Sequence, residues 1–356
     1  MKKIKDFSKH LIKEELSLLG AMDLLNSSAL EFKTLFVVRD NKLVGSVSDG
    51  DIRRWVLKSG SLNACAKDFA NPNPKFVYEG ELEKAKSIFR YPGIVIIPAV
   101  NEEKEIVGLL IEKPSNEVEM QKKIDVPVVI MAGGAGTRLY PYTKILPKPL
   151  IPIGDDPIIV RIINFFKAQG CHRFYMIVNH KKNMIKAYFS EDMHPDYELT
   201  FIDEDIPLGT GGGLSLLQGM INEPFILTNC DNIINVDFSD VLKRHTDSGS
   251  AITVLSSVQK VVIPYGVIHL GDEGYIEKME EKPTLPYLIN TGCYVVNPEV
   301  VNSLEVGARI DFPTIIANRM GLGDHVGVYP INSEDFLDMG QFDQMERMKN
   351  VLHIKD

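Results

Sequence analysis

The sequence has little of what marks secreted or membrane-spanning proteins. Its 356 residues include four cysteines (Cys65, Cys171, Cys230 and Cys293), and no two of them form a Cys-x-x-Cys motif. No apolar run approaches the length of a membrane span, and no apolar stretch follows the basic residues at the start. We therefore expect no signal peptide, no membrane span and no disulfide framework, and we expect the protein in the cytoplasm with reduced thiols.

An excess of basic charge is also absent. The chain has 39 Lys and Arg against 48 Asp and Glu, a net charge of −9, and it shows no local basic patch. An acidic chain is a poor binder of nucleic acid and of anionic membranes, so we expect neither as a partner. The eight histidines show no metal-ligand spacing. The length allows two or three domains with sizeable cores.

Residues 1–115 contain a weak internal repeat, and each copy has the order strand, polar turn, strand. The strands are predicted at residues 35–38 and 43–48 in the first copy, and at residues 94–97 and 106–110 in the second. A helix follows the first copy at once, and Asp49 or Asp51 can serve as its cap. The repeat predicts a small α+β domain built from two similar modules, about 1–63 and 64–115.

This half resembles a pair of CBS modules in the run from Gly45 to Arg53. The resemblance implies that Ser48 and Asp51 hold the phosphate and ribose of a regulatory adenine nucleotide, with a guanine nucleotide also open. The second copy continues with Glu112-Lys113-Pro114 and has no matching Asp. A packing or dimerisation module is the alternative. By analogy with other CBS pairs, we expect a homo-oligomer.

A polar linker is predicted at residues 116–125, and a different pattern fills residues 126–356. Apolar strands are expected at 128–131, 174–178 and 225–228, alternating with amphipathic helices that begin at Pro157 and near Asn183. Asp155 or Asp156 can cap the first of these helices, and Gly170 can end it. This alternation predicts an α/β domain with a doubly wound, mainly parallel sheet.

A glycine-rich run follows the first of these strands, from Gly133 to Leu139. It has no Gly-Lys-Ser/Thr, as a P-loop requires, and the third glycine of a dinucleotide loop would fall on Leu139. Its backbone N–H groups can still approach a phosphate chain closely. Arg138 and Lys148 add two cations around the turn. This combination suits a nucleoside triphosphate whose pyrophosphate leaves.

At this point the resemblance becomes specific. The run from Gly133 to Leu139, followed by Pro147-Lys148-Pro149, is very similar to the signature of sugar-1-phosphate nucleotidylyltransferases. Five further stretches match that family in order: Pro207-Leu208-Gly209-Thr210-Gly211-Gly212, Asn229-Cys230-Asp231, Glu281-Lys282-Pro283, Asn290-Thr291-Gly292-Cys293-Tyr294 and Leu337-Asp338-Met339-Gly340. Six motifs in the family's order form a strong signal, although each one alone is weak.

The resemblance also implies roles for single residues. Asp231 and Asp338 would hold Mg²⁺, Arg138 would stabilise the leaving pyrophosphate, and Lys148 would lie on the α-phosphate side. The nucleotide would contact Ala132, Gly133, Gly134, Gly136, Thr137, Gly209 and Thr210. The sugar phosphate would contact Glu281, Lys282, Asn290 and Gly292. Because the phosphate of a sugar 1-phosphate is already an adequate nucleophile, positioning and electrostatics suffice and Cys230 is not needed as a nucleophile.

The sequence constrains the identities of the nucleotide and of the sugar less than it constrains the family. The run from Pro147 to Ile153 looks like mannose-1-phosphate guanylyltransferases. A CBS pair ahead of this domain resembles the glucosamine-1-phosphate guanylyltransferases of legionaminic acid synthesis. GTP and glucosamine 1-phosphate are therefore the predicted substrates. Uridylyl, thymidylyl or cytidylyl transfer to another hexose 1-phosphate remains an alternative, as does a regulatory protein that senses nucleotides without turnover.

Overall fold

The computed structural model describes residues 1–4, 6–27, 30, 32–91, 93–112, 123–190, 196–340 and 342–351. The chain forms two compact units, one of Met1–Glu119 with Val258–Leu288 and the other of Met120–Ser257 with Ile289–Asp356. Most of the predicted linker lies outside the described residues. The predicted domain boundaries stay predictions, and the grouping of 258–288 with the N-terminal residues was not foreseen. Within the described residues, no helix is long and apolar enough to cross a membrane.

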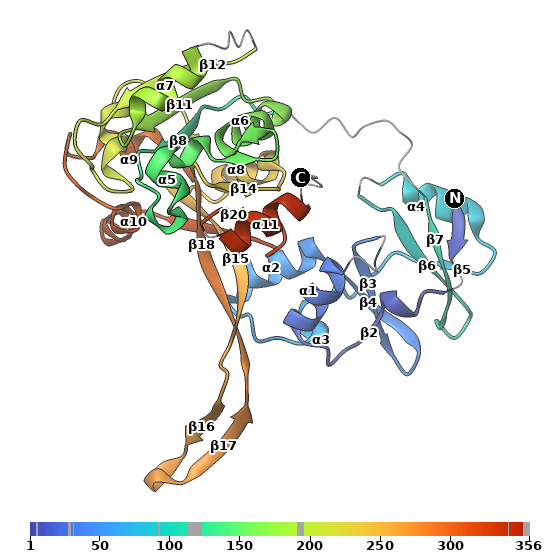
Figure 1. The fold of residues 1–356 in the computed structure, drawn as a ribbon. Helices are drawn as coiled ribbons and strands as arrows, with labels where there is room; N and C mark the ends of the chain where they lie inside the picture. Colours follow the sequence, from blue (N-terminus) through green and yellow to red (C-terminus); the bar gives the residue numbers. More distant parts are fainter. Residues whose placement is uncertain are drawn as a thin grey trace. The chain divides into compact units, whose positions relative to one another are not determined.

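A seven-stranded sheet forms the centre of the second unit, with the strand order β12-β11-β8-β13-β18-β15-β19 (Figure 1). The first four strands in that order run parallel, β18 runs antiparallel to β13, and β15 and β19 are parallel. The strands are β8 (Val128–Ala132), β11 (Arg173–Val178), β12 (Glu198–Asp203), β13 (Phe225–Asn229), β15 (Ile252–Val262), β18 (Thr284–Val296) and β19 (Val326–Ile331). This confirms the predicted doubly wound, mainly parallel sheet.

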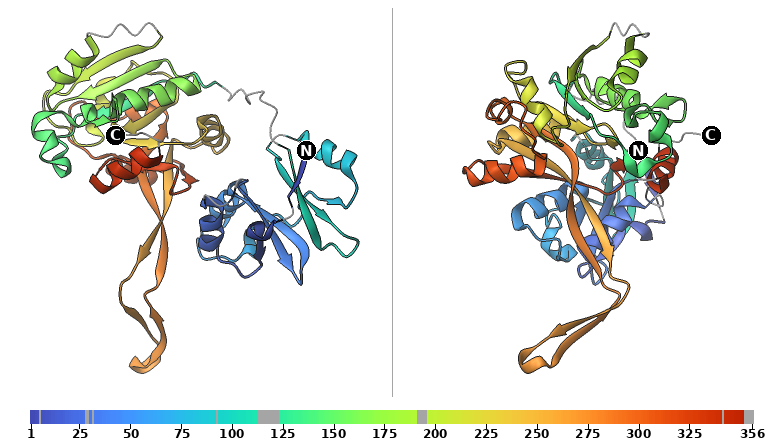
Figure 2. Two further views of the ribbon diagram at one scale, coloured as in Figure 1. Left: turned by 45° about the vertical axis from the view of Figure 1, so that its right-hand side comes forward. Right: turned by 60° about the vertical axis from the view of Figure 1, so that its left-hand side comes forward.

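Both faces of this sheet are buried, because successive side chains along a strand point to opposite sides. Val128 and Ile130 of β8 pack into one core cluster, and Val129 between them packs into another. The first cluster includes residues of α6 (Ile158–Gln169), α7 (Lys182–Ser190), α8 (Phe238–Asp247) and α11 (Phe342–Val351). The second includes residues of α9 (Pro298–Asn302), α10 (Phe312–Gly321) and the 3₁₀ segment Gly212–Leu217. Figure 2 shows α6, drawn in green, packed along the sheet.

A short helix and two short strand pairs also belong to this unit. These are α5 (Tyr142–Ile145), the pair β9 (Pro152–Ile153) and β10 (Asp156–Pro157), and the pair β14 (Asn232–Ile234) and β20 (Phe336–Asp338). The predicted helix at Pro157 exists and ends at Gly170, but its N-cap is Pro157 and not Asp155 or Asp156. Asp156 instead belongs to β10, where the antiparallel pairing with Ile153 holds its backbone extended.

Among its described residues, the N-terminal part of the first unit contains two small sheets and four α-helices. One sheet has the order β1-β7-β6-β5 and the other β2-β3-β4. The strands are β1 (Lys2–Ile4), β2 (Leu11–Lys13), β3 (Thr34–Arg39), β4 (Lys42–Ser48), β5 (Val77–Tyr78), β6 (Ile96–Val100) and β7 (Ile106–Ile111). The helices are α1 (Leu18–Asn26), α2 (Asp49–Ser59), α3 (Ala66–Phe69) and α4 (Leu82–Phe89). Both predicted strand-turn-strand copies are confirmed, with β6 starting two residues later than expected.

The helix after the first copy, α2, is capped with the help of Asp51, one of the two predicted residues, which acts from inside the first turn. Ser48 is the N-cap of α2, and Asp51 at the third helical position accepts hydrogen bonds from the backbone N–H of Ser48 at 2.9 Å and from its hydroxyl at 2.7 Å. Such a capping box satisfies donors that the first helical turn leaves free. Asp49 therefore lies inside the helix and is not its cap.

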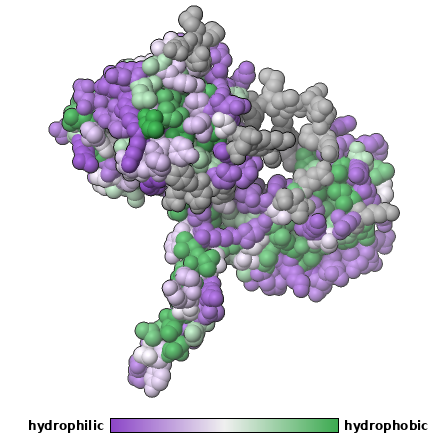
Figure 3. Space-filling model, in the orientation of Figure 1, coloured by the Kyte–Doolittle hydropathy of each residue, from purple (hydrophilic) through white to green (hydrophobic). Residues whose placement is uncertain are grey.

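The remaining part of the first unit carries a hairpin of β16 (Gly266–Leu270) and β17 (Ile276–Glu281). Its strands carry four large apolar side chains that are more than half exposed: Ile268, Leu270, Ile276 and Met279. Figure 3 shows green hydrophobic patches along the hairpin. Glu280 forms an ion pair with Lys278, and the ring of His269 lies 3.7 Å from the same carboxylate.

Candidate active site

Two connected cavities lie in the second unit, where β8 and β13 end. One has a volume of about 540 Å³ and the other about 280 Å³. They share Met131, Arg138, Thr210, Asn229 and Asp231. Open α/β sheets bind ligands at the carboxyl ends of their strands, and the summed volume is that of an ordinary ligand site. The structure therefore has a cavity at the place where the glycine-rich run predicted a ligand site.

The larger cavity is lined by the glycine-rich loop. Residues 133–139 all contribute to its wall, together with Lys148, Gly209 and Thr210. The loop is held from behind, because the hydroxyl of Thr143 donates to the carbonyl of Gly136 at 2.8 Å. Of the residues predicted to contact the nucleotide, Ala132 alone is not part of this wall, since it lies buried at the end of β8.

The two predicted metal ligands are brought together by the pairing of β14 with β20. In this register Asn232 lies opposite Asp338, and the N–H of Met339 donates to the carbonyl of Asp231 at 2.8 Å. Both carboxylates line the smaller cavity. Burial first, and then the neighbouring charge of Asp231, raises the pKa of Asp338, while Lys148 and Arg138 oppose this shift.

Lys148 occupies the space beside these carboxylates. Its ammonium donates to Asp231, and the two side chains are only 12% and 11% exposed. Asp231 is one cause of the raised pKa of Asp338, and a hard divalent cation would neutralise the charge of two such converging carboxylates. Oxygen is the ligand that Mg²⁺ prefers, so the donor set fits the predicted metal. No group of three or more His, Cys, Asp or Glu side chains suited to a metal occurs in the described part of the chain, so other ligands would come from substrate and water.

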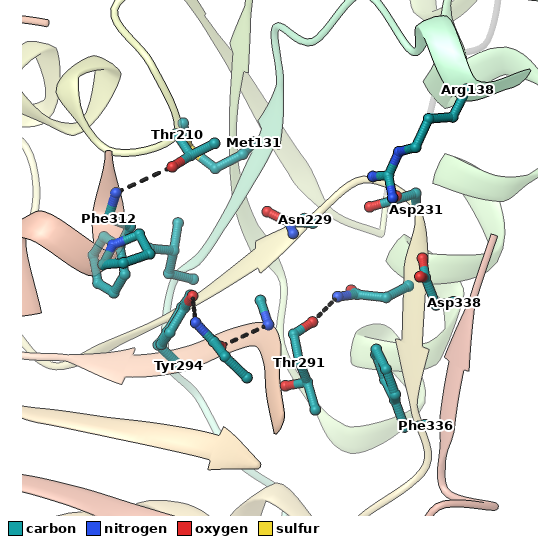
Figure 4. Close-up of a pocket in the computed structure, with 15 residues that line it drawn as sticks. Met131, Arg138, Thr210, Asn229, Asp231, Thr291, Tyr294, Phe312, Phe336 and Asp338 are labelled. Carbon is teal, nitrogen blue, oxygen red and sulfur yellow. Dashed lines mark hydrogen bonds between the residues drawn. The ribbon is translucent and has the colours of Figure 1, made fainter. Parts of the chain in front are cut away.

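Arg138 extends its guanidinium toward Asp231 (Figure 4). It lines both cavities. A forked cation at the junction of the two spaces is placed to interact with a phosphate chain that runs from one to the other.

The smaller cavity is bounded by the strand that carries Asn290 and Gly292. The Asn290 amide donates to the hydroxyl of Tyr294 at 2.8 Å, and its oxygen accepts from the N–H of Gly292 at 3.0 Å (Figure 4). A side chain at Gly292 would collide with Asn229, and the backbone there has a φ of +75°. Burial raises the pKa of Tyr294 to about 12, so its hydroxyl stays neutral. These contacts fix the amide of Asn290 at the cavity wall.

Thr210 is held by a residue that the sequence reading passed over. The carboxylate of Asp311 accepts from the N–H of Thr210 at 2.9 Å and from its hydroxyl at 3.2 Å. The Thr210 hydroxyl in turn accepts from the N–H of Phe312 at 3.1 Å. These bonds tie the Gly209–Thr210 turn to the start of α10.

Other predicted site residues lie elsewhere. Glu281 and Lys282 belong to the first unit, at the end of β17, and neither lines the two cavities. Their predicted contact with the sugar phosphate stays a prediction. Ser48 and Asp51 also lie in the first unit, where Asp51 additionally accepts from Arg54. The predicted nucleotide ligands of the CBS module therefore bond to each other.

Several residues at the cavities were missed. Asn179, His180 and Glu204 line the larger cavity, and Asn232, Thr291, Phe312 and Pro313 line the smaller one. Asn232 follows Asp231 by one residue, and Glu204 precedes the Pro207–Thr210 motif by three, so proximity to a motif could have indicated both. Phe312 lies near none of the recognised motifs, so the sequence did not indicate it. Cys230 is buried, and this burial raises its pKa to about 12, which keeps the thiol protonated.

Comparison with known proteins decides the family. The nucleotidyl transferase family model matches residues 127–353. The chain belongs to the nucleotidyl transferase family. A CBS domain model also matches residues 6–58, which covers the first of the two predicted modules.

Named relatives of this nucleotidyl transferase differ in base and sugar. A mannose-1-phosphate guanyltransferase of Pichia angusta is 36% identical over 50% of this chain and 51% of its own length. A UTP–glucose-1-phosphate uridylyltransferase of Synechocystis is 27% identical over 63% of each protein. The chain thus spans about half to 63% of the length of these relatives.

The fold has a counterpart among solved structures. The crystal structure of HddC from Yersinia pseudotuberculosis matches with a TM-score of 0.51 at 23% identity, covering 64% of this chain and 99% of HddC. At this identity the likeness concerns the fold. The predicted nucleotidyl transferase domain and the first predicted CBS module agree with the two family matches.

Proposed function

We propose that this nucleotidyl transferase is a Mg²⁺-dependent guanylyltransferase that joins GMP from GTP to glucosamine 1-phosphate and releases pyrophosphate. One observation carries the proposal: the Asp231–Asp338 carboxylate pair, with Lys148 and Arg138, lies in the walls of the larger and the smaller cavity, which share Arg138 and Asp231. The mannose-1-phosphate guanyltransferase at 36% identity supports guanine as the base.

The geometry supports an in-line transfer. The triphosphate would lie along the glycine-rich loop of the larger cavity, and the sugar 1-phosphate in the smaller one. A phosphate oxygen of the sugar 1-phosphate attacks the α-phosphorus, the bond to the β-phosphate oxygen breaks, and pyrophosphate leaves.

Each charged side chain has a part in this transfer. Lys148 would neutralise charge on the α-phosphate, and Arg138 would stabilise the pyrophosphate as it leaves. Asp231 and Asp338 would hold the magnesium ion, which orients the phosphates and reduces their negative charge. Asn290, fixed by Tyr294 and Gly292, would bond a sugar hydroxyl. No protein nucleophile takes part.

The test is pyrophosphate release from GTP, UTP, dTTP and CTP against a panel of glucosamine, N-acetylglucosamine, glucose and mannose 1-phosphates with Mg²⁺. Release with GTP and glucosamine 1-phosphate above all other pairs is the expected result. A different best pair would replace the base or the sugar and retain the class. No release with any pair, while Mg²⁺-dependent nucleotide binding persists, would favour a sensor without turnover.

The CBS part has its own proposed role, in regulation. It would bind an adenine or guanine nucleotide through Ser48 and Asp51 and change the rate of transfer. Homo-oligomer formation and a cytoplasmic location are proposed with it. The product of this transfer would be a GDP-sugar precursor of a bacterial surface glycan. The most specific form of this hypothesis is a role in legionaminic acid synthesis.

A further inference from the structure

A lysine that lines neither cavity is bonded to the segment behind the glycine-rich loop. Lys181 lies in the turn between β11 and α7, and its ammonium donates to the carbonyls of Thr143, Lys144 and Ile145 at 2.9, 2.7 and 3.0 Å. An ammonium group has three N–H donors, so these three carbonyls can use all of them. The side chain of Lys181 is therefore committed to one short stretch of backbone.

That stretch is α5, a helix of four residues. The last carbonyls of a helix have no partner within it, and a cationic side chain can satisfy them. A helix of this length is not stable by itself, so contacts with other segments must hold it in place. The ammonium of Lys181 is one such contact, and it ties α5 to the turn between β11 and α7.

The short helix in turn supports the glycine-rich loop. Thr143 is 1% exposed, and its hydroxyl donates to the carbonyl of Gly136 at 2.8 Å. The approach is close, because a side chain at Gly136 would lie 3.0 Å from Thr143 and 3.1 Å from Lys148. A continuous series of contacts therefore runs from Lys181 through Thr143 to the loop that lines the larger cavity.

The same turn also holds the start of the loop. The N–H of His180 donates to the carbonyl of Gly133 at 3.4 Å. Lys181, the next residue, has a φ of +54°, in the left-handed region that residues other than glycine, asparagine and aspartate seldom adopt. Such a backbone persists where surrounding contacts hold it, and it is common near ligand sites. Two adjacent residues of this turn thus support two points of the loop.

We propose that Lys181 is a positioning residue, which holds the glycine-rich loop in the shape that receives the phosphates of the nucleotide. Backbone N–H groups bind a phosphate only at hydrogen-bond distance, and a misplacement of about 1 Å can cost about 100-fold in rate. This inference rests on the proposed function, because it takes the larger cavity as the site of a nucleoside triphosphate.

The first measurement is amide hydrogen exchange over residues 136–146 in the full-length protein without nucleotide. The N–H of Leu139 donates to the carbonyl of Gly136 at 3.0 Å and reports on the loop, while the N–H of Leu146 reports on α5. Lys181→Met keeps the length of the side chain and removes its donors. This variant should exchange at least tenfold faster at both positions, and exchange elsewhere in the chain shows that it is folded.

Lys182→Met is the matched control. Lys182 is the next residue, and its ammonium lies 3.8 Å from Asp203 and 3.6 Å from Asp205. The control therefore loses the same charge in the same turn and keeps the three bonds to α5. Its exchange over residues 136–146 should equal that of the wild type.

Thr143→Val tests the path of this support. It removes the hydroxyl that bonds Gly136 and retains the backbone carbonyl that Lys181 uses. Exchange at Leu139 should rise about as much as in Lys181→Met. The double variant should exchange no faster than the faster single variant, because both substitutions interrupt the same series of contacts.

The second measurement is calorimetric binding of GTP and of guanosine in the presence of Mg²⁺. Guanosine lacks the phosphates that the loop would receive. Lys181→Met should bind GTP at least tenfold more weakly than the wild type and should bind guanosine equally well. A general structural role of Lys181 would weaken both ligands alike.

Equal exchange over residues 136–146 in Lys181→Met and Lys182→Met would overturn the inference, and so would an equal loss of affinity for GTP and guanosine. A wild type that binds no GTP would contradict the proposed function instead. The exchange comparison needs no nucleotide, so it would still show whether Lys181 holds the loop.

Discussion

The chemistry of the candidate site depends on a few side chains whose neighbours set their charge. Lys148 and Asp231 neutralise each other in a buried pair, while Glu204 has no such partner and keeps a raised pKa of about 7. Sequence motifs indicated the first pair, because Lys148 and Asp231 each lie in a run that resembles the family. Glu204 was missed because its isolation is a property of packing: the slot between Gly133 and Gly213 is visible only in three dimensions.

The raised pKa of Glu204 predicts a pH dependence of stability. The native state keeps this proton up to about pH 7, whereas the unfolded chain loses it near the ordinary value of 4.5. The contribution of Glu204 to the free energy of unfolding should therefore fall as the pH rises between these two values and be constant above about 7. Urea unfolding followed by circular dichroism between pH 5 and 8 measures this.

The control for that profile is Glu204→Gln, which cannot titrate at this position. The other ionisable groups at the same cavity, among them Arg138, Lys148, His180 and Asp231, are common to both proteins. The difference between the two free energies of unfolding therefore isolates the carboxyl group. A difference that does not vary with pH would refute the prediction.

At the scale of elements, the pairing of β14 with β20 brings two separate sequence motifs together. The two strands come from segments about a hundred residues apart, and their register brings Asp338 beside Asp231. The alternation of strands and helices could be predicted from hydrophobic periodicity, and so could the ligand edge of the sheet. The β14–β20 pair could not, because strands of three residues carry too little pattern to indicate a partner.

A substitution at Leu337 tests the positioning role of the β14–β20 pair. This residue is 3% exposed, pairs with Ile233 and packs in the core cluster that includes α6. Leu337→Ala should lower the free energy of unfolding by about 2–4 kcal/mol, because it leaves a cavity in that core. It should also lower kcat, because Asp338 next to it loses its fixed position. Urea unfolding followed by circular dichroism, with pyrophosphate release, measures both.

Leu322→Ala is the matched control, since Leu322 is 75% exposed at the end of α10. It should change neither quantity measurably. If Leu337→Ala were destabilised and kept a full kcat at a temperature where it is folded, the positioning role of β20 would be contradicted.

At the scale of the whole molecule, the chain joins a nucleotidyl transferase unit to one that includes a CBS domain. The predicted regulation can be followed in the latter, because Trp55 is the only tryptophan of the chain and lies on α2, as Asp51 does. Adding AMP should change the fluorescence of Trp55 and the rate of transfer over the same concentration range. Asp51→Asn should weaken both effects at least tenfold.

Asp68→Asn is the control for this regulation. Asp68 caps α3 much as Asp51 caps α2, since it accepts from the N–H of Cys65 at 2.8 Å, but it has no predicted nucleotide role. Loss of either capping carboxylate should cost about 1 kcal/mol of stability, and only the loss of Asp51 should remove the AMP response. Equal loss in both variants would show that the response depends on helix stability alone.

The hairpin of β16 and β17 was predicted only in part from the sequence. Its motif Glu281-Lys282-Pro283 was recognised, yet the exposure of Ile268, Leu270, Ile276 and Met279 was not anticipated. The sequence shows which residues are apolar, but it does not show whether another segment covers them.

The central claim is nucleotidyl transfer at the Asp231–Asp338 pair, and one measurement tests it most directly. It is the rate of pyrophosphate release from GTP and glucosamine 1-phosphate with Mg²⁺, in the wild type and in Asp231→Asn. The account predicts release by the wild type and a loss of at least about 100-fold in a variant that still folds, because the charge of the carboxylate pair is halved. Equal rates in the two proteins would contradict the account.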